Sequence, residues 1–184
     1  MEWDHFDYSR IREMRNNFVP LDTVKAFVGL KDGQSLIDVG AGDGFYALTF
    51  ASENPKSEIT ALEPGHNGLL LIKKQISELG IKNVEVIEED VCKVHDYSHY
   101  DKVFFSNVFH DLGCKEEALK AMSSTFRKGS EVVFIEFRKE VEAGPPQHIR
   151  ISESELKSML EKHGFRLLAS EKLQLHYMHK YIKE

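Results

Sequence analysis

LIDVGAGDGFYALTFA, residues 36–51, is the stretch that decides the fold of this chain. An apolar run ends at Asp38, and glycines follow at Gly40, Gly42 and Gly44 before an apolar pattern typical of a helix. Glycine permits positive φ and lets a ligand come close to the backbone, while the first turn of a helix has free N–H groups. We therefore expect a buried strand, a tight turn and a helix N-terminus that faces a ligand with a negative group.

Asp38 adds a second requirement to this loop. A carboxylate at the end of the strand would repel a phosphate, but it would attract an ammonium group or a ribose hydroxyl. The ligand that fits best therefore carries both a negative and a positive group.

Length and composition indicate one soluble globular domain. The chain has 184 residues, of which 41% are hydrophobic and 29% charged. Its formal net charge is −6, from 24 basic and 30 acidic residues, and no basic block is present, so a nucleic-acid partner is not expected. We expect a single domain over residues 1–184 that binds small molecules, with residues 1–30 as an N-terminal helical preface or lid.

The N-terminal sequence MEWDHFDYSR has no apolar core of a signal peptide, and no run approaches the roughly 18 apolar residues of a membrane helix. A cytoplasmic location without membrane contact is expected, and the oligomeric state stays open. Cys92 and Cys114 are far apart and form no CxxC motif, which favours idle thiols over a disulfide or a zinc site. No metal site is expected, since His176 and His179 fall on opposite faces of a predicted strand.

Apolar runs and helical patterns alternate along most of the chain, which is typical of a parallel sheet covered on both faces. Near the C-terminus, two apolar runs at 165–171 and 174–182 are too close for a crossover helix and should pair as an antiparallel hairpin. The predicted fold class is α/β: a Rossmann-like three-layer sandwich with a mostly parallel seven-stranded sheet that ends in this hairpin. The other expected strands are residues 35–39, 59–63, 84–88, 102–107 and 131–137.

Five motifs in this order resemble those of the class I S-adenosylmethionine (SAM) dependent methyltransferases. DVGAGDG at 38–44 is similar to the first motif of that family, and ALEPG at 61–65 to the second. EEDV at 88–91 resembles the third, and YDKVFFSNVFHDL at 100–112 the strand-four motif. FRKGSEVVFIEF at 126–137 resembles the passage into strand five, with a serine where a second glycine is common.

Three short motifs in the C-terminal part indicate a branch within this family. The GPP loop at 144–146, IRIS at 149–152 and HGF at 163–165 are similar to the small-molecule branch that includes ubiquinone and menaquinone C-methyltransferases. This resemblance implies a SAM-dependent methyltransferase that transfers a methyl group to a small-molecule acceptor and releases S-adenosylhomocysteine.

The resemblance also implies which residues bind the cofactor. The glycine loop and Asp38 would bind the methionine part, and Glu63 would accept hydrogen bonds from the ribose diol through its two carboxylate oxygens. Asp90 and the Val91 amide would bind adenine, and the end of strand four would lie beside the methyl group. The implied cofactor-binding residues are Asp38, Gly40, Ala41, Gly42, Gly44, Glu63, Pro64, Asp90, Val91, Asn107 and Val108.

Two alternatives stay open at this point. Gly42, Gly44 and Ala47 also satisfy a dinucleotide-binding pattern, which would make the chain a small NAD-dependent oxidoreductase. Asp38 and the terminal hairpin argue against it, because a pyrophosphate would avoid the acid and the usual dinucleotide fold lacks the hairpin. A non-catalytic SAM-binding or sensing domain is the second alternative.

Catalysis requires little from the protein in this reaction. Methyl transfer from a sulfonium is an in-line displacement, so positioning and desolvation supply much of the acceleration. His110, just after strand four, is the best-placed candidate for a general base; Asp111, Tyr8 and His148 are further candidates. His110 would otherwise cap or pack against the following helix, and Asp111 would serve as its N-cap.

The covering segments are expected to determine the acceptor. The aromatic stretch from Trp3 to Tyr8, backed by Arg15, would close as a lid unless it is an ordinary packed terminus. The loop at 144–150 would close from the other side. Its His148 and Arg150 would suit an acidic or phenolic acceptor, with a solvated loop as the alternative. The sequence does not specify the methylated atom.

Overall fold

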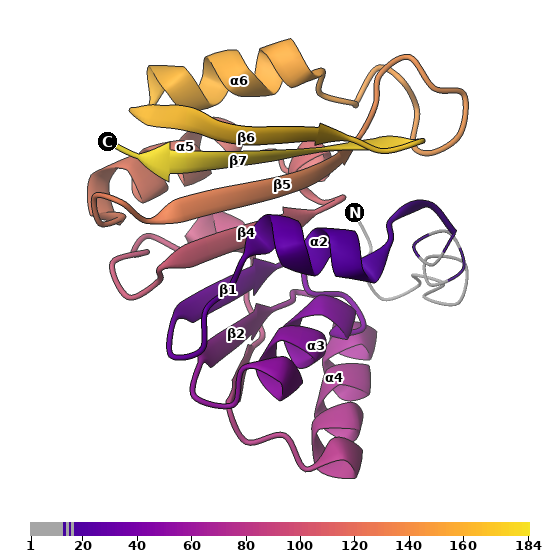
Figure 1. Cartoon of the computed structure of the whole chain (residues 1–184), viewed down its shortest axis with the longest axis vertical. Helices are drawn as coiled ribbons and strands as arrows, with labels where there is room; N and C mark the ends of the chain where they lie inside the picture. The colour runs from indigo at the N-terminus through magenta and orange to yellow at the C-terminus, as the bar shows by residue number, and fades with distance from the viewer. Residues whose placement is uncertain (1–12, 14, 16) are drawn as a thin grey trace.

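The computed structural model describes residue 13, residue 15 and residues 17–184. One seven-stranded sheet runs through this part of the chain in the order β3-β2-β1-β4-β5-β7-β6 (Figure 1). Its strands are β1 Ser35–Val39, β2 Glu58–Leu62, β3 Val84–Ile87, β4 Lys102–Ser106, β5 Glu131–Phe137, β6 Phe165–Lys172 and β7 His176–Lys183.

Helices cover both faces of the sheet. On one face, α2, α3 and α4 pack apolar side chains such as Val24, Phe50 and Ile72 against the strands. On the other, α5 and α6 do so with residues such as Leu119 and Leu156. The helices are α2 Leu21–Val28, α3 Phe45–Glu53, α4 His66–Leu79, α5 Lys115–Thr125 and α6 Glu153–Lys162, and short 3₁₀ turns are η2 Val91–Lys93 and η3 Phe109–Asp111.

Each central strand supplies both cores because successive side chains point to opposite faces. In β4, Phe104 packs with the α3 side of the sheet and Phe105 with the α5 side, and both are fully buried. The ring of Phe105 stacks on Phe134 of β5 with centroids 5.0 Å apart. Burial on both faces explains why these strands are continuous apolar runs.

The predicted fold is confirmed. Strands β1 to β5 are parallel to one another, and β7 enters between β5 and β6 antiparallel to both. The hairpin places His176 opposite Phe137, at the end of the sheet where the parallel strands finish. Helix α6 begins with a capping box, in which Ser152 and Glu155 exchange side-chain to backbone hydrogen bonds.

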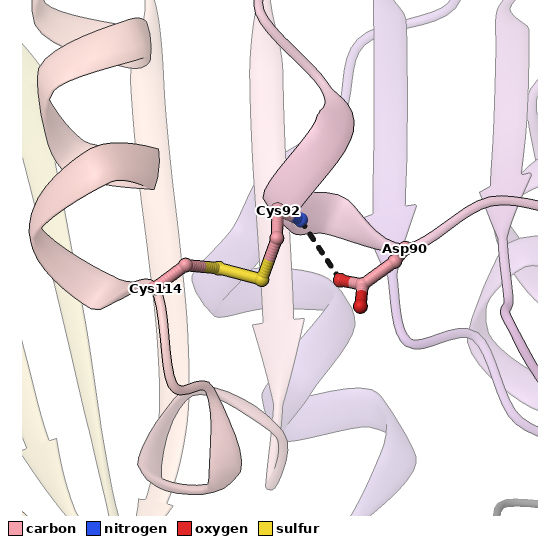
Figure 2. Close-up of side chains that lie close together, drawn as sticks. All are labelled: Asp90, Cys92 and Cys114. Carbon is pink, nitrogen blue, oxygen red and sulfur yellow. Dashed lines mark hydrogen bonds between the residues drawn. A yellow bond between two sulfur atoms is a disulfide. The ribbon is translucent and has the colours of Figure 1, made fainter.

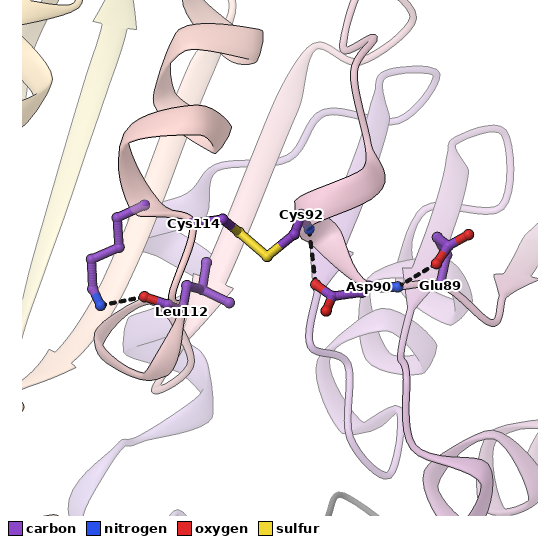
Figure 3. The surroundings of a disulfide bond; sticks show 6 residues. Glu89, Asp90, Cys92, Leu112 and Cys114 are labelled. Carbon is purple, nitrogen blue, oxygen red and sulfur yellow. Dashed lines mark hydrogen bonds between the residues drawn. A yellow bond between two sulfur atoms is a disulfide. The ribbon is translucent and has the colours of Figure 1, made fainter. Parts of the chain in front are cut away.

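The prediction for the two cysteines is wrong. Cys92 in η2 and Cys114 at the N-cap of α5 form a disulfide, with Cα atoms 5.7 Å apart (Figure 3). The loops that carry them follow β3 and β4, which are not neighbours in the sheet, so their proximity depends on the path of both loops after the strands end. A separation of 22 residues in the sequence gave no sign of it.

The aromatic stretch of the expected N-terminal lid, Trp3 to Tyr8, lies outside the described residues. In the part that the structure covers, no helix is both long and apolar enough to cross a membrane.

Candidate active site

A cavity of ≈ 280 Å³ lies at the carboxyl ends of the parallel strands, the edge at which open α/β sheets bind their ligands. Gly44 does not line it; instead it precedes α3 with φ +80°, and a Cβ there would lie 2.7 Å from Cγ1 of Ile72. The other residues predicted to bind the cofactor, and His110, line this cavity: Asp38, Gly40, Ala41, Gly42, Glu63, Pro64, Asp90, Val91, Asn107, Val108 and His110.

The glycine loop is held against two neighbouring strand ends. The amides of Gly40 and Ala41 donate to the Leu62 carbonyl at 2.8 and 3.0 Å. Gly40 has φ +69°, and a Cβ at this position would lie 2.6 Å from Cγ2 of Val108, so only glycine fits. The loop therefore approaches the end of β4 closely and forms one wall of the cavity.

Glu63 joins the second strand to the loop. Its two carboxylate oxygens accept from the backbone N–H groups of Gly42 and Gly65, each at 2.8 Å. Burial raises the pKa of Glu63 above its ordinary value, and the two N–H bonds oppose this rise. Each oxygen keeps a further lone pair for a ligand hydroxyl.

Asp38 is buried beneath the loop. Its Oδ2 accepts from the N–H of Ala47 at 3.1 Å. Burial raises the pKa of Asp38 to about 7; the bond from Ala47 lowers it, and the nearby carboxylates of Glu63 and Asp43 raise it further. A cation bound in the cavity would relieve this cost of ionisation.

Asp90 stands beside the disulfide (Figure 2). Its Oδ1 accepts from the N–H of Cys92 at 2.9 Å, which leaves Oδ2 for a ligand. The donor atoms of Asp90, Cys92 and Cys114 lie within 4.8 Å of one another, but the sulfurs are joined and offer no thiolate to a metal ion. The absence of a metal site stays a prediction.

The end of β4 is conformationally unusual. Asn107 has φ +56°, which is uncommon for a residue other than glycine, and its N–H donates to the Ile135 carbonyl at 2.8 Å. Its Oδ1 is buried and has no hydrogen-bond partner among the described residues. A buried unpaired acceptor next to a cavity indicates a ligand that donates to it.

His110 points its ring between two acids. Its Nδ1 lies 2.6 Å from Oε2 of the buried Glu136, and its Nε2 lies 3.5 Å from Oδ2 of Asp111. Burial lowers the pKa of His110, but the hydrogen bond and charge of Glu136, helped by Asp111, outweigh this effect and raise it above its ordinary value. Sequence reasoning missed Glu136, although an acid within the apolar run EVVFIEF was a signal.

Neither His110 nor Asp111 caps the following helix. His110 and Asp111 lie in η3, whereas α5 begins at Lys115 after its N-cap Cys114. The prediction that Asp111 caps the helix is therefore wrong, because an extra turn separates it from α5.

His176 is the main residue that the sequence did not reveal. It lines the cavity at 1% exposure, and its ring lies against Phe137 with centroids 4.1 Å apart. Neither ring nitrogen has a hydrogen-bond partner among the described residues. Burial, and then the charge of His110, lowers the pKa of His176 to about 4, so its ring is neutral near pH 7.

The two basic residues expected in the 144–150 loop do not reach the cavity. Arg150 is buried and donates to the carbonyls of Arg138, Pro145 and Val141, which holds the loop in place. His148 is exposed. Pro145 is the residue of this loop that lines the cavity. Arg15 also lines the cavity, and its guanidinium carbon lies 3.6 Å from the centroid of the Phe45 ring.

Comparisons with known proteins agree with this geometry. Residues 30–181 match the model of a methyltransferase domain family. The structure is similar to that of a SAM-dependent methyltransferase from Aquifex aeolicus, with a TM-score of 0.83 and 26% identity over 97% of this chain and 100% of that one.

Curated relatives include two kinds of methyltransferase. A probable (S)-tetrahydroprotoberberine N-methyltransferase of Papaver bracteatum is 29% identical over 55% of this chain and 28% of its own length. Ribosomal RNA small subunit methyltransferase G of Laribacter hongkongensis is 35% identical over 50% of this chain and 44% of its own. The chain thus spans less than half the length of these relatives.

The family match covers both the glycine loop and the terminal hairpin. It excludes the NAD-dependent oxidoreductase that the glycine spacing also allowed. With its seven-stranded sheet, the chain belongs to the class I SAM-dependent methyltransferases, whose cofactor is S-adenosylmethionine.

Proposed function

We propose that this chain transfers the methyl group of SAM to a small-molecule acceptor by in-line displacement at the sulfonium. The observation that carries the proposal is that the glycine loop, Glu63 and Asp90 meet at one cavity beside the end of β4. Loop amides, a ribose acid and an adenine acceptor would hold the cofactor along this edge, with its methyl group toward Asn107 and His110.

The proposed contacts use the hydrogen-bonding atoms of each group that the protein itself leaves available. Oδ2 of Asp90 is available to the adenine amino group, and the Val91 amide to a ring nitrogen. Glu63 uses the remaining lone pairs of its two oxygens for the ribose hydroxyls. Asp38 receives the methionine ammonium and ionises when the cation arrives.

A small acceptor is favoured over RNA by the charge of the chain. Its formal net charge is −6, whereas RNA binding requires a positive surface for the phosphates. Phe137, Pro145 and His176 also line the cavity of ≈ 280 Å³, and we propose that they contact a small acceptor. The similarity to both N-methyltransferases and ribosomal RNA methyltransferases makes RNA the competing acceptor to be tested.

Radiolabelled SAM tests the acceptor class directly. The protein is incubated with SAM labelled in the methyl group and, separately, with a panel of phenols, amines and thiols or with ribosomal RNA. We expect label in a small molecule and none in RNA. Label in RNA alone would contradict the small-molecule proposal. A SAM-binding domain without catalysis would bind cofactor and label nothing.

Variants test the cofactor contacts in the same assay. We expect Glu63→Gln and Asp90→Asn each to raise KM for SAM about 10-fold or more, because each weakens hydrogen bonds made by a charged group. Glu85→Gln, an exposed position of β3 outside the cavity, is the matched control. Equal KM values for all three would contradict the proposed contacts.

The cellular location of the protein is a further part of the proposal. We propose a cytoplasmic protein, and cell fractionation with and without thiol trapping tests this location together with the state of Cys92 and Cys114.

A further inference from the structure

Glu136 is a fully buried carboxylate near the end of β5, with 1% of its surface exposed. Its Oε1 accepts from the backbone N–H groups of Phe109 and His110 at 3.0 and 3.3 Å, and its Oε2 lies 2.6 Å from Nδ1 of His110. A buried charge is costly unless it is hydrogen-bonded, and these three contacts satisfy it. The strand thereby anchors η3, the turn that carries His110, at the rim of the cavity.

This arrangement determines the tautomer of the imidazole. An ionised carboxylate has no proton to donate, so Nδ1 of His110 must carry the proton that the 2.6 Å contact shares. The lone pair of the neutral ring is then on Nε2. Because His110 itself lines the cavity, a basic nitrogen is available at the end of β4, where the methyl group is proposed to lie.

Titratable groups from four elements face His110. Glu136 of β5 and Asp111 of η3 favour its protonated form, whereas Lys115 of α5 disfavours it. His176 of β7 is neutral near pH 7 and adds no charge there. The acidic side chains prevail, and they make His110 a stronger base than a solvent-exposed histidine.

We propose that Glu136 is a positioning residue that holds His110 as the Nδ1–H tautomer, so that Nε2 removes the proton of the methyl acceptor's nucleophile. This inference rests on the proposed function. It restricts the acceptor to one whose reacting atom bears a proton, such as a hydroxyl group or an amine, and disfavours tertiary amines and thioethers.

The reaction balances within this site. As the nucleophile forms its bond to the methyl carbon, the carbon–sulfur bond breaks and its electron pair stays on sulfur as the neutral thioether of S-adenosylhomocysteine. The proton of the nucleophile goes to Nε2 and leaves an imidazolium between Glu136 and Asp111. Asp111, whose side chain is 18% exposed, then gives the proton a route to solvent.

His176 offers the acceptor a second contact. Its two buried ring nitrogens have no partner among the described residues, and its ring lies beside Phe137 at the wall of the cavity. An acceptor with a second polar group would satisfy one of these nitrogens. A planar acceptor would also pack against the Phe137 ring.

NMR of the full chain, labelled with ¹⁵N in histidine and titrated with and without S-adenosylhomocysteine, tests the positioning role without any acceptor. In the wild type we expect the Nδ1–H tautomer of His110 and a pKa above its ordinary value. In Glu136→Gln, the amide group donates to Nδ1 while its oxygen still accepts from the two backbone N–H groups. The proton then resides on Nε2, and the pKa falls by about one unit or more.

Glu140→Gln is the matched control, because Glu140 is exposed and pairs with Arg138 at the surface. It should leave the titration of His110 unchanged. An Nε2–H tautomer in the wild type would overturn the proposal even if Glu136→Gln failed to fold. An identical His110 titration in wild type and Glu136→Gln would overturn it as well.

Turnover separates this inference from the proposed function. With an acceptor identified by the labelling panel, we expect kcat of Glu136→Gln to fall about 10²- to 10⁴-fold while KM for SAM changes little. The rising limb of the kcat–pH profile should also move to lower pH. If S-adenosylhomocysteine does not bind, the proposed function fails, yet NMR of the ligand-free protein still decides the role of Glu136. An unshifted profile with normal cofactor binding would reject the positioning role alone.

Discussion

The buried carboxyl group of Asp38 lowers the stability of the folded protein when it ionises, and the same group is proposed to bind the ammonium group of the ligand. The carboxyl group is 2% exposed, and its pKa is raised to about 7 by burial, despite the bond from Ala47. The group therefore binds a proton in the folded chain at a pH at which the unfolded chain has released it. Its contribution to stability is complete below about pH 4 and is lost as the pH rises to about 7 and beyond.

Asp38→Asn should therefore stabilise the ligand-free protein at pH 8. A shift of about three units corresponds to about 4 kcal/mol, which is an upper bound for the gain in the free energy of unfolding. The amide oxygen can still accept from Ala47, but it cannot pair with an ammonium, so affinity for S-adenosylhomocysteine should fall at the same time. Urea unfolding at pH 4 and pH 8, with calorimetric binding, checks both effects. A variant less stable at pH 8 and unchanged in affinity would refute this account of Asp38.

At the scale of elements, the disulfide joins two loops of the cavity wall. Asp90 and Val91 directly precede Cys92, and Leu112 lies two positions before Cys114 (Figure 3). Asp90, Val91 and Leu112 all line the cavity. The bond therefore restrains η2 and the start of α5 relative to each other, on the side where adenine is proposed to bind.

Reduction of this bond should lower the free energy of unfolding by about 3 kcal/mol, the loop-closure value for a separation of 22 residues. Affinity for S-adenosylhomocysteine should fall several-fold, because the adenine side of the cavity loses its restraint. Urea unfolding and binding are measured with and without reductant, and the Cys92→Ser, Cys114→Ser double variant serves as the control that reductant does not affect. Equal unfolding midpoints for oxidised and reduced wild type would contradict the prediction.

Features that depend on neighbouring residues could be predicted from the sequence, whereas features that depend on tertiary contacts could not. The strands and the glycine turn arise from local apolar patterns and backbone requirements, and the structure has them where expected. The role of Glu136 depends on His110, which is 26 residues away in the sequence, and that of Arg150 depends on the path of the chain between residues 138 and 150. Arg150 looked like an acceptor contact, yet three carbonyls of its own loop region occupy its guanidinium.

At the scale of the whole molecule, the sheet order places the candidate site. Strands β1 and β4 are neighbours, with β2 and β5 outside them, so the residues that follow these four strands meet at one edge. The antiparallel β7 then delivers His176 to the same edge from the opposite direction. Class I methyltransferase topology thus explains why loop, acids and histidines that are far apart in the sequence share one cavity (Figure 1).

Isothermal titration calorimetry with S-adenosylhomocysteine tests the central claim most directly. The account predicts binding of one molecule per chain, weakened about 10-fold or more by Asp90→Asn and unchanged by the control Glu85→Gln. Folded protein that gives no heat of binding at millimolar S-adenosylhomocysteine would contradict the assignment of this cavity to the methyl donor.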